Sequence, residues 1–377
     1  MTIGKNKILF ITTNYPQFLG EFYKKNPKLE KLSYKKNKEL LMKEFFGSSN
    51  FYSNNIKKYG WVTDDVIAND WDMQSKWAAE HNIKVMKDEL FFYKYIPEYI
   101  LIMLGLRNWV KRILLAQIED FKPDIVYMHH LGLLNSSDIK KIKKSARLVV
   151  GQIASPLPIN KKPLYSYDII FSSFPHYVQM FKRMGIKSEY LPWCAEDTLV
   201  KKIKPSKRIY NVTVIGGFSP YHSRGNKVFE NLARSVKIDF WGYREHTLSP
   251  SSPILKNFHG QAWGKEMYKI FSKSKIVINR HINVSQGYAN NLRMFEATTM
   301  GALLITDHKK NMNEFFVVGK EVVTYRNAKE LIRKVKYYLA HPKEARKIAE
   351  KGQKRTLKDH TYKIRMQELD KILRNHL

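Results

Sequence analysis

An arginine and a glutamate stand three residues apart in the C-terminal half of the chain, in a stretch that reads NNLRMFEATTMGALLITD. We expect residues 290–307 to form a short helix, a turn at Gly301 and a buried strand. Residues three apart share one face of a helix, so Arg293 and Glu296 would act together. A guanidinium beside a carboxylate near a helix start suits a ligand that carries both phosphate and sugar hydroxyl groups. Asn291 belongs to the same polar helix start, and a plain surface ion pair is the alternative interpretation.

A glycine pair followed by cations ends the first predicted strand of this half, Tyr210–Gly217. The absence of side chains at Gly216 and Gly217 lets the backbone approach a phosphate closely. Cationic and polar groups after the pair would neutralise a diphosphate leaving group. These residues are Ser219, His222, Arg224 and Lys227.

Further predicted strands of this half end in aromatic, imidazole or cationic groups. The carboxyl ends of parallel strands meet at one edge of a sheet, where open α/β sheets bind ligands. We expect Arg280 and His281, which follow the apolar run KIVIN, to face a crevice or solvent, because a charged pair is costly to bury. Aromatic and imidazole groups would frame a nucleobase, although Trp241 fits a core position equally well. The other residues of this set are Gly242, His259, Gly260 and Trp263.

Apolar runs alternate with helical patterns along the chain, which predicts α/β architecture. The pattern stops at a lysine- and proline-containing connection and then restarts, so we expect two tandem domains, residues 1–197 and 208–377. Predicted strands of the first domain are residues 7–14, 62–69, 125–130, 147–154, 168–174 and 189–194, and its predicted helices include residues 51–59, ended by Gly60, and 100–121. Predicted strands of the second domain are residues 210–217, 236–243, 257–261, 275–281, 302–306 and 321–325, followed by two or three helices over residues 328–377.

Two features of the first domain bear on binding. Residues 18–50 form a lysine-rich insertion after the first strand, which is either a contact for an acceptor or membrane or a solvated segment. Asp70-Trp71-Asp72 is similar to an Asp-x-Asp metal motif, but it stands directly before a helical stretch, where an aspartate commonly caps the helix. We favour the cap.

Three histidines follow strands of the first domain and are candidates for a general base on an acceptor hydroxyl. They are His129, His130 and His176. A structural role is the alternative for each of them.

The chain has 377 residues, 66 lysines and arginines against 34 aspartates and glutamates, and a formal net charge of +32. Such an excess predicts attraction to anions. Cys194 is the only cysteine, which excludes a disulfide within the chain. We predict no signal peptide, and residues 99–106 are far short of the roughly 20 residues that span a bilayer. The expectation is a cytoplasmic protein, with contact to an anionic membrane as an addition.

The run from His259 to Asp307, HGQAWGKEMYKIFSKSKIVINRH…GYANNLRMFEATTMGALLITD, resembles the donor domain of GT-B glycosyltransferases. It is most similar to the group-1-like bacterial enzymes related to spore-maturation glycosyltransferases. The segments FFVVGKEVVTYRNAKELIRKVKYYLAHP, VIANDWDMQSKWA, KPDIVYMHH and VVGQIASPLP…YDIIFSSFPHYVQMF extend the resemblance over nearly the whole chain.

The resemblance implies two Rossmann-like domains with the active site in an interdomain cleft, a nucleotide-sugar donor on the C-terminal domain and an acceptor on the N-terminal one. It implies that Glu296 binds the donor ribose and that Arg224 and Lys227 bind the diphosphate. It implies no metal, and no cofactor, since the nucleotide sugar is a substrate. Many relatives carry an earlier glutamate, where this chain has Tyr288, or Gln286 if the alignment shifts by two residues.

The predicted function is transfer of a sugar from a nucleotide sugar to a glycan, lipid-linked or protein acceptor. The altered Tyr288 position motivates one alternative, a non-catalytic nucleotide-sugar-binding or scaffold protein of a glycan-assembly pathway. The net charge motivates a second, a nucleic-acid-binding protein. The lysines are dispersed along the chain and no RNA- or DNA-binding module is visible, so we expect no nucleic-acid partner.

Overall fold

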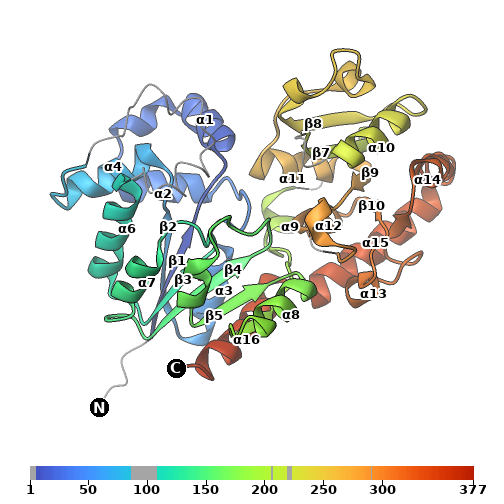
Figure 1. Ribbon diagram of the computed structural model, residues 1–377. Coiled ribbons are helices and arrows are strands. Elements are labelled where there is room, and N and C mark those ends of the chain that lie inside the picture. Colours follow the sequence, from blue (N-terminus) through green and yellow to red (C-terminus); the bar gives the residue numbers. More distant parts are fainter. Residues whose placement is uncertain (1–5, 86–107, 205–206, 219–222, 290) are drawn as a thin grey trace. The chain divides into compact units, whose positions relative to one another are not determined.

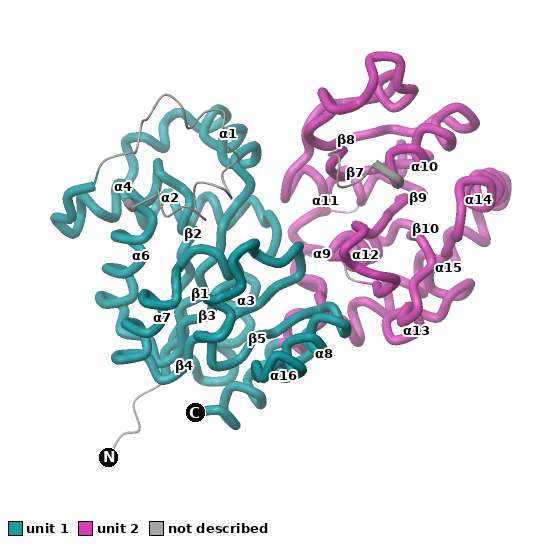
Figure 2. The backbone as a smooth tube through the Cα atoms, viewed as in Figure 1, with its two compact units in different colours: residues 1–191, 366–377 teal, residues 192–365 magenta. Residues whose placement is uncertain are grey.

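The computed structural model describes residues 6–85, 108–204, 207–218, 223–289 and 291–377, and the chain divides into two compact units. Unit 1 comprises Met1–Leu191 and Met366–Leu377, and unit 2 comprises Pro192–Arg365 (Figure 2). Each unit is built on one parallel sheet accompanied by helices (Figure 1). The predicted α/β class with two Rossmann-like domains is therefore confirmed.

The sheet of unit 1 has six strands in the order β2-β1-β3-β4-β5-β6. All neighbouring strands run parallel. Every residue of β3 and β4 is buried, as expected for parallel strands covered on both faces. The strands are β1 (Lys7–Thr12), β2 (Val62–Ile67), β3 (Ile125–Met128), β4 (Leu148–Ile153), β5 (Ile169–Ser172) and β6 (Ser188–Tyr190).

Helices and 3₁₀ turns connect these strands. They are α1 (Pro16–Lys25), η1 (Pro27–Lys31), α2 (Tyr34–Met42), α3 (Phe51–Ile56), η2 (Lys57–Tyr59), α4 (Trp71–Glu80), α6 (Asn108–Phe121), α7 (Ser136–Ile142), η4 (Lys162–Ser166) and α8 (Pro175–Arg183). The lysine-rich insertion thus contains α1, η1 and α2. The helix predicted over residues 51–59 is confirmed, with Gly60 ending it at a φ of 88°. The first eight residues of the helix predicted over 100–121 lie outside the described part of the chain, and α6 ends at the predicted Phe121.

Asp70 caps α4, as predicted. Its carboxylate accepts a hydrogen bond from the Met73 backbone N–H at 3.1 Å, and the Tyr23 hydroxyl donates to both of its oxygens at 2.8 Å. The second contact fastens α1 to the start of α4. Burial raises the pKa of Asp70 to about 7, and the two hydrogen bonds oppose this shift only in part.

The sheet of unit 2 has five parallel strands in the order β11-β10-β9-β7-β8. The strands are β7 (Tyr210–Gly217), β8 (Asp239–Tyr243), β9 (Ser274–Asn279), β10 (Leu303–Asp307) and β11 (Val323–Tyr325). Their apolar side chains form a core with α10 and the later helices; Val214, Phe229, Ile278 and Leu331 are members. Residues 257–261 do not form the full predicted strand, because a 3₁₀ turn extends to Asn257. The segment still lies beside β8: Phe258 bridges Phe240, the His259 N–H donates to the Phe240 carbonyl oxygen, and the Gly242 N–H donates to the Gly260 carbonyl oxygen, each at 2.9 Å.

The helices and turns of unit 2 begin with α9 (Leu199–Lys202), α10 (Ser223–Ala233), η6 (Glu245–Thr247), η7 (Pro253–Asn257), α11 (Gly264–Ser272), η8 (Asn283–Ser285), α12 (Leu292–Thr299) and α13 (Met312–Phe315). The predicted C-terminal helices are α14 (Ala328–Ala340), α15 (Pro342–Asp359) and α16 (Tyr362–Arg374), and the last of these contributes residues to both units. In the described part of the chain, no helix is long and apolar enough to cross a bilayer.

Candidate functional site

The strand order of unit 2 places a topological switch point between β7 and β9. The chain leaves β7 for β8 on one side and returns to β9 on the other side of β7. Connecting helices therefore diverge at this point, and open α/β sheets bind ligands in the resulting crevice outside the carboxyl ends of the strands. Gly216 and Gly217 end β7, and Arg280 and His281 directly follow β9. The structure thus brings together the glycine pair and the charged pair, which are 63 to 65 residues apart in the sequence.

The glycines at this edge serve two different purposes. A side chain at Gly216 would meet nothing within 4 Å, so this position leaves room above the sheet. A Cβ at Gly242 would lie 1.8 Å from the carbonyl oxygen of Gly216, and one at Gly217 would lie 2.8 Å from the Tyr243 ring. Gly217 and Gly242 are therefore required by packing within the sheet, and of these three glycines Gly216 is the one that leaves room for a ligand.

Arg280 turns back onto its own unit. Its Nη2 donates to the carbonyl oxygen of Gly217 at 2.8 Å, and its guanidinium lies 4.4 Å from the centre of the Phe229 ring. A Cβ at Gly225, in the first turn of α10, would overlap the arginine side chain. Burial lowers the pKa of Arg280 to about 10. Its Nη1 is buried and has no hydrogen-bond partner among the described residues, so this cation keeps one donor uncommitted at the start of α10.

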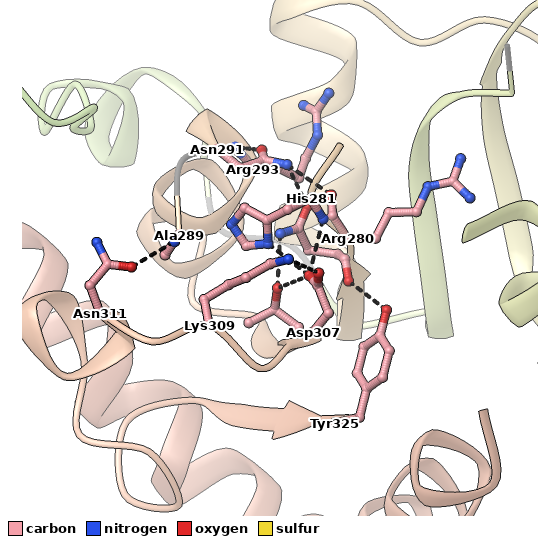
Figure 3. Close-up of polar contacts among 11 residues, drawn as sticks. Arg280, His281, Ala289, Asn291, Arg293, Asp307, Lys309, Asn311 and Tyr325 are labelled. Atoms are coloured by element: carbon pink, nitrogen blue, oxygen red, sulfur yellow. Dashed lines mark hydrogen bonds and ion pairs between the residues drawn. The ribbon is translucent and has the colours of Figure 1, made fainter. Parts of the chain in front are cut away.

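His281 is held by a carboxylate from the neighbouring strand (Figure 3). The distance from His281 Nδ1 to Asp307 Oδ1 is 2.7 Å, and the backbone N–H of His281 donates to the same oxygen at 3.0 Å. The second oxygen of Asp307 pairs with Lys309 at 2.9 Å. Burial alone would raise the pKa of Asp307, but His281 and Lys309 hold it well below its usual range. The expectation that Arg280 and His281 both face a crevice or solvent is thus wrong for His281, whose side chain is 0% exposed, because Asp307 offsets the cost of its burial.

The Arg293–Glu296 ion pair, near the start of α12, is largely buried. Arg293 Nη1 lies 2.7 Å from Glu296 Oε2, and the two side chains are 24% and 6% exposed. The Tyr268 hydroxyl of α11 donates to the other carboxylate oxygen at 3.4 Å, while Arg293 also contacts Met267 of that helix. Burial raises the pKa of Glu296, and Arg293 opposes this shift only in part. The surface alternative is therefore excluded, and the ion pair joins α12 to α11.

Asn291 fixes the start of α12 to the end of β9. Its side-chain oxygen accepts from the Arg293 backbone N–H at 2.7 Å. Its amide nitrogen donates to Asn279 Oδ1 and to the Arg280 carbonyl oxygen, each at 3.0 Å. Asn291 thus caps α12 and also binds the end of β9, which positions Arg293 relative to the switch point (Figure 3).

The aromatic candidates divide between two places. Trp241 is 6% exposed, packs edge-on to Tyr210 and stacks on His259 at 4.4 Å, and His259 pairs with Asp239 at 2.9 Å. Asp239 is the first residue of β8, so the His259 ring lies near the start of this strand and not at the carboxyl edge of the sheet. The burial of Trp241 agrees with the interpretation of this residue as part of the core. Trp263 instead lies 5.2 Å from the ring of Tyr243 at the end of β8. Gly260 has a left-handed backbone conformation, with a φ of 86°.

The loop and first turn after β7 are described only in part. Ser219 and His222 lie outside the described residues. Arg224 falls within the first turn of α10. Lys227 is exposed on the same helix. Sequence reasoning missed Asp307, Lys309 and Tyr243 as site residues. Asp307 immediately follows the apolar run 302–306, and Lys309 lies two residues further on, which is the same signal that selected Arg280 and His281.

Unit 1 has its own switch point between β1 and β3, and two candidate histidines follow β3 there. The His129 backbone N–H donates to the Ile11 carbonyl oxygen at 2.8 Å, and its ring packs against Phe10, Tyr52 and Tyr127. Burial lowers the pKa of His129 to about 3, which makes it a weak base at neutral pH.

The other two histidines differ in their surroundings. Burial also lowers the pKa of His130, whose Nδ1 accepts from the Gly132 backbone N–H at 3.2 Å. His176 lies in the first turn of α8 beside Phe174 and Tyr177. Over the described residues, no group of three or more histidine, cysteine, aspartate or glutamate side chains has the arrangement of a metal site.

Comparisons with known proteins agree with this geometry. Residues 198–371 match the family model described as glycosyl transferase-like. A search of curated protein sequences gave no match. The chain is similar in structure to sucrose-phosphate synthase from Thermosynechococcus elongatus, with a TM-score of 0.61, 11% identity and 98% of each chain covered.

Two further solved structures have nucleotide sugars bound. HepE of Anabaena in complex with UDP-glucose has a TM-score of 0.59 and 11% identity, with 98% of this chain and 99% of that chain covered. UDP-GlcNAc 2-epimerase from Neisseria meningitidis bound to UDP-GlcNAc has a TM-score of 0.52 and 14% identity, with 98% and 100% covered. Such low identities establish the fold alone. The chain has the GT-B fold of these neighbours, and the family match over residues 198–371 agrees with the resemblance to group-1-like GT-B glycosyltransferases and supports glycosyl transfer in general.

Proposed function

We propose that the protein transfers a sugar from a nucleotide-sugar donor to a glycan, lipid-linked or protein acceptor, with the donor bound by unit 2. The observation that carries the proposal is the position of the charged groups. The segment that matches the glycosyl transferase-like model contains the β7–β9 switch point, and Arg280, His281 and the Arg293–Glu296 pair all lie on elements that end or begin at that edge.

Each group has a defined task in this proposal. Gly216 leaves space for the diphosphate, and Arg224, Lys227 and the free donor of Arg280 neutralise the charge that develops on it as the glycosidic bond breaks. Glu296 accepts hydrogen bonds from the ribose hydroxyls, for which it must exchange part of its contact with Arg293. We propose that these cations act without a metal. The Asp70-Trp71-Asp72 motif would then bind no metal, and the role of Asp70 would be to cap α4.

The acceptor hydroxyl requires a proton acceptor if the reaction inverts the anomeric centre. Among the candidates in unit 1, His129 is disfavoured by its low basicity. His130 and His176 remain the proposed bases. Measuring donor consumption for His130→Gln and His176→Gln separates them, and a loss of about 100-fold in turnover is expected for the base.

Binding of nucleotide sugars tests the proposal directly. Calorimetric titration with UDP-, GDP-, CMP- and dTDP-sugars should give saturable binding to at least one, unaffected by EDTA. Glu296→Ala should weaken that binding by about tenfold or more, whereas the exposed Glu266→Gln on α11 should leave it unchanged. Absence of binding to every sugar nucleotide, or full activity in Glu296→Ala, would reject it.

Product analysis separates transfer from two other outcomes. A glycosylated acceptor, or slow hydrolysis of the donor in its absence, supports the transferase. Binding without consumption of the donor indicates a non-catalytic sugar-nucleotide-binding protein. Inversion at the sugar C2 position with the nucleotide retained indicates an epimerase, a reaction class represented among the proteins of this fold.

We also propose that the protein works in the cytoplasm and that the insertion of unit 1 contacts an anionic membrane, where a lipid-linked acceptor would be found. Its exposed lysines support this: Lys24, Lys25, Lys28, Lys31, Lys35, Lys36 and Lys43. Near an anionic surface each is worth up to about 1 kcal/mol. Co-sedimentation with phosphatidylserine vesicles at low salt, lost at high salt and with phosphatidylcholine alone, is the expected result.

A further inference from the structure

The imidazole of His281 is bound through one nitrogen and unsatisfied at the other. Nδ1 lies 2.7 Å from Asp307, while Nε2 is buried and has no hydrogen-bond partner among the residues that the structure describes. Buried polar atoms are nearly always hydrogen-bonded, because leaving one without a partner is costly. The free nitrogen therefore needs an explanation that the protein itself does not provide.

The surroundings of Asp307 determine which nitrogen carries the proton. The carboxylate accepts from the His281 backbone N–H, from the Thr306 hydroxyl at 3.3 Å and from Lys309, and the charge of Lys309 favours its ionised form. An ionised carboxylate only accepts hydrogen bonds, so Nδ1 must present its hydrogen to it. In the neutral ring Nε2 is then a lone-pair acceptor, the arrangement by which a carboxylate commonly fixes the tautomer of a histidine.

His281 also has the right place for a ligand contact. It is the second residue after β9, at the switch point, and the carbonyl oxygen of the preceding Arg280 accepts a hydrogen bond from the helix cap Asn291. Because the ring is fully buried, a ligand reaches Nε2 only after a local movement. The following residues, 282–289, are fastened to the segment after β10 by hydrogen bonds from Ala289 N–H to Asn311 Oδ1 at 2.7 Å and from Lys310 N–H to the Gly287 carbonyl oxygen at 2.9 Å.

We infer that His281 is a ligand-contacting residue of the donor site, in which Nε2 accepts a hydrogen bond from a hydroxyl group of the bound sugar nucleotide. The inference rests on the proposed function. It takes the ring as neutral and therefore specifies a hydroxyl rather than a phosphate as the contacted group, because Nε2 of a neutral ring protonated at Nδ1 has a lone pair and cannot donate to a phosphate oxygen. Asp307 is the positioning residue that holds the ring and its tautomer.

The test compares ligands and variants by calorimetry. His281→Asn places an amide nitrogen where Nδ1 donates to Asp307 and removes Nε2, so it keeps the structural contact and deletes the proposed one. His308→Asn is the matched control, since His308 is exposed and follows Asp307 directly. The ligands are the best-binding sugar nucleotide of the panel, its nucleoside diphosphate and inorganic pyrophosphate.

We expect His281→Asn to bind the sugar nucleotide about tenfold more weakly and pyrophosphate with unchanged affinity. A parallel loss for the nucleoside diphosphate locates the hydroxyl on the ribose, and no loss there locates it on the transferred sugar; both support the inference. Equal binding of the sugar nucleotide by His281→Asn and wild type overturns it, as does an equal loss for pyrophosphate. If the wild type binds no sugar nucleotide, the proposed function itself fails, which is a different result.

If His281→Asn does not fold, imidazole ¹⁵N NMR of the wild-type protein tests whether Nε2 of His281 contacts the sugar nucleotide. With His281 assigned through its backbone, Nδ1 should be protonated with and without ligand. The Nε2 resonance should shift on addition of the sugar nucleotide and stay in place on addition of pyrophosphate. An Nε2 resonance that does not respond to the sugar nucleotide overturns the inference.

Discussion

Removing Arg293 should destabilise the protein in a strongly pH-dependent way. The perturbation is Arg293→Met, which keeps an unbranched apolar stem but removes the guanidinium and, among the described side chains, leaves the buried Glu296 carboxylate with the Tyr268 hydroxyl, at 3.4 Å, as its remaining partner. Breaking a buried ion pair costs about 3–5 kcal/mol, because it leaves an uncompensated charge. Arg293 is 24% exposed, so water screens part of this and we expect about 2–4 kcal/mol at pH 8.

The pH dependence follows from the position of the proton. Burial already raises the pKa of Glu296, and loss of Arg293 removes the group that opposes this shift. A carboxyl group whose folded pKa lies above its unfolded pKa binds more protons in the folded state, so the free energy of unfolding falls as pH rises between the two values. The variant should therefore be close to wild type near pH 5 and clearly weaker at pH 8.

Urea denaturation at both pH values measures the effect. The double variant Arg293→Met/Glu296→Gln should recover most of the stability at pH 8, because a neutral amide replaces the unpaired charge. The matched control is Lys269→Met, which breaks an ion pair of the same spacing on α11 whose side chains are 46% and 58% exposed, and it should cost less than about 0.5 kcal/mol. A pH-independent loss in Arg293→Met, or a double variant no more stable than the single one, would refute the reasoning.

Three further predictions concern the scaffold. Burial raises the pKa values of Asp65 and Asp70 to about 7, so the free energy of unfolding should fall between pH 5 and pH 8, and Asp65→Asn should flatten this dependence in denaturation curves. Arg208 donates to the Phe271, Met300 and Gly301 carbonyl oxygens at 3.1, 3.0 and 2.6 Å, so Arg208→Met should cost about 3 kcal/mol by urea denaturation; a loss below about 1 kcal/mol would contradict this role. Gly242→Ala would place its Cβ 1.8 Å from a carbonyl oxygen of β7 and should lower the melting temperature markedly, whereas Gly20→Ala, with nothing within 4 Å, should not.

Much of the fold follows from local pattern. The apolar runs at residues 125–130 and 302–306 predicted buried strands, and both are strands, because a parallel strand covered on two faces needs apolar side chains at every position. Asp70 was recognisable as a cap from its place before a helical stretch. The prediction for residues 257–261 was less accurate because this run is short. The extent of such a strand depends on its pairing with β8, which the local sequence does not determine.

The candidate site was likewise predictable from the sequence only in part. Residue types and their order along the chain determined that glycines, cations and an Arg-x-x-Glu pair follow the strands of the second half, and that parallel strands would collect them at one edge. Only the tertiary structure decided which way each side chain turns: Arg280 onto Gly217 and Phe229, His281 onto Asp307, and Glu296 towards α11. Sequence spacing sets the position of a backbone, but the direction of a charged side chain depends on which distant partner offsets its desolvation. Asp307, 26 residues beyond His281 in the chain, is that partner, and strand order alone brings the two together.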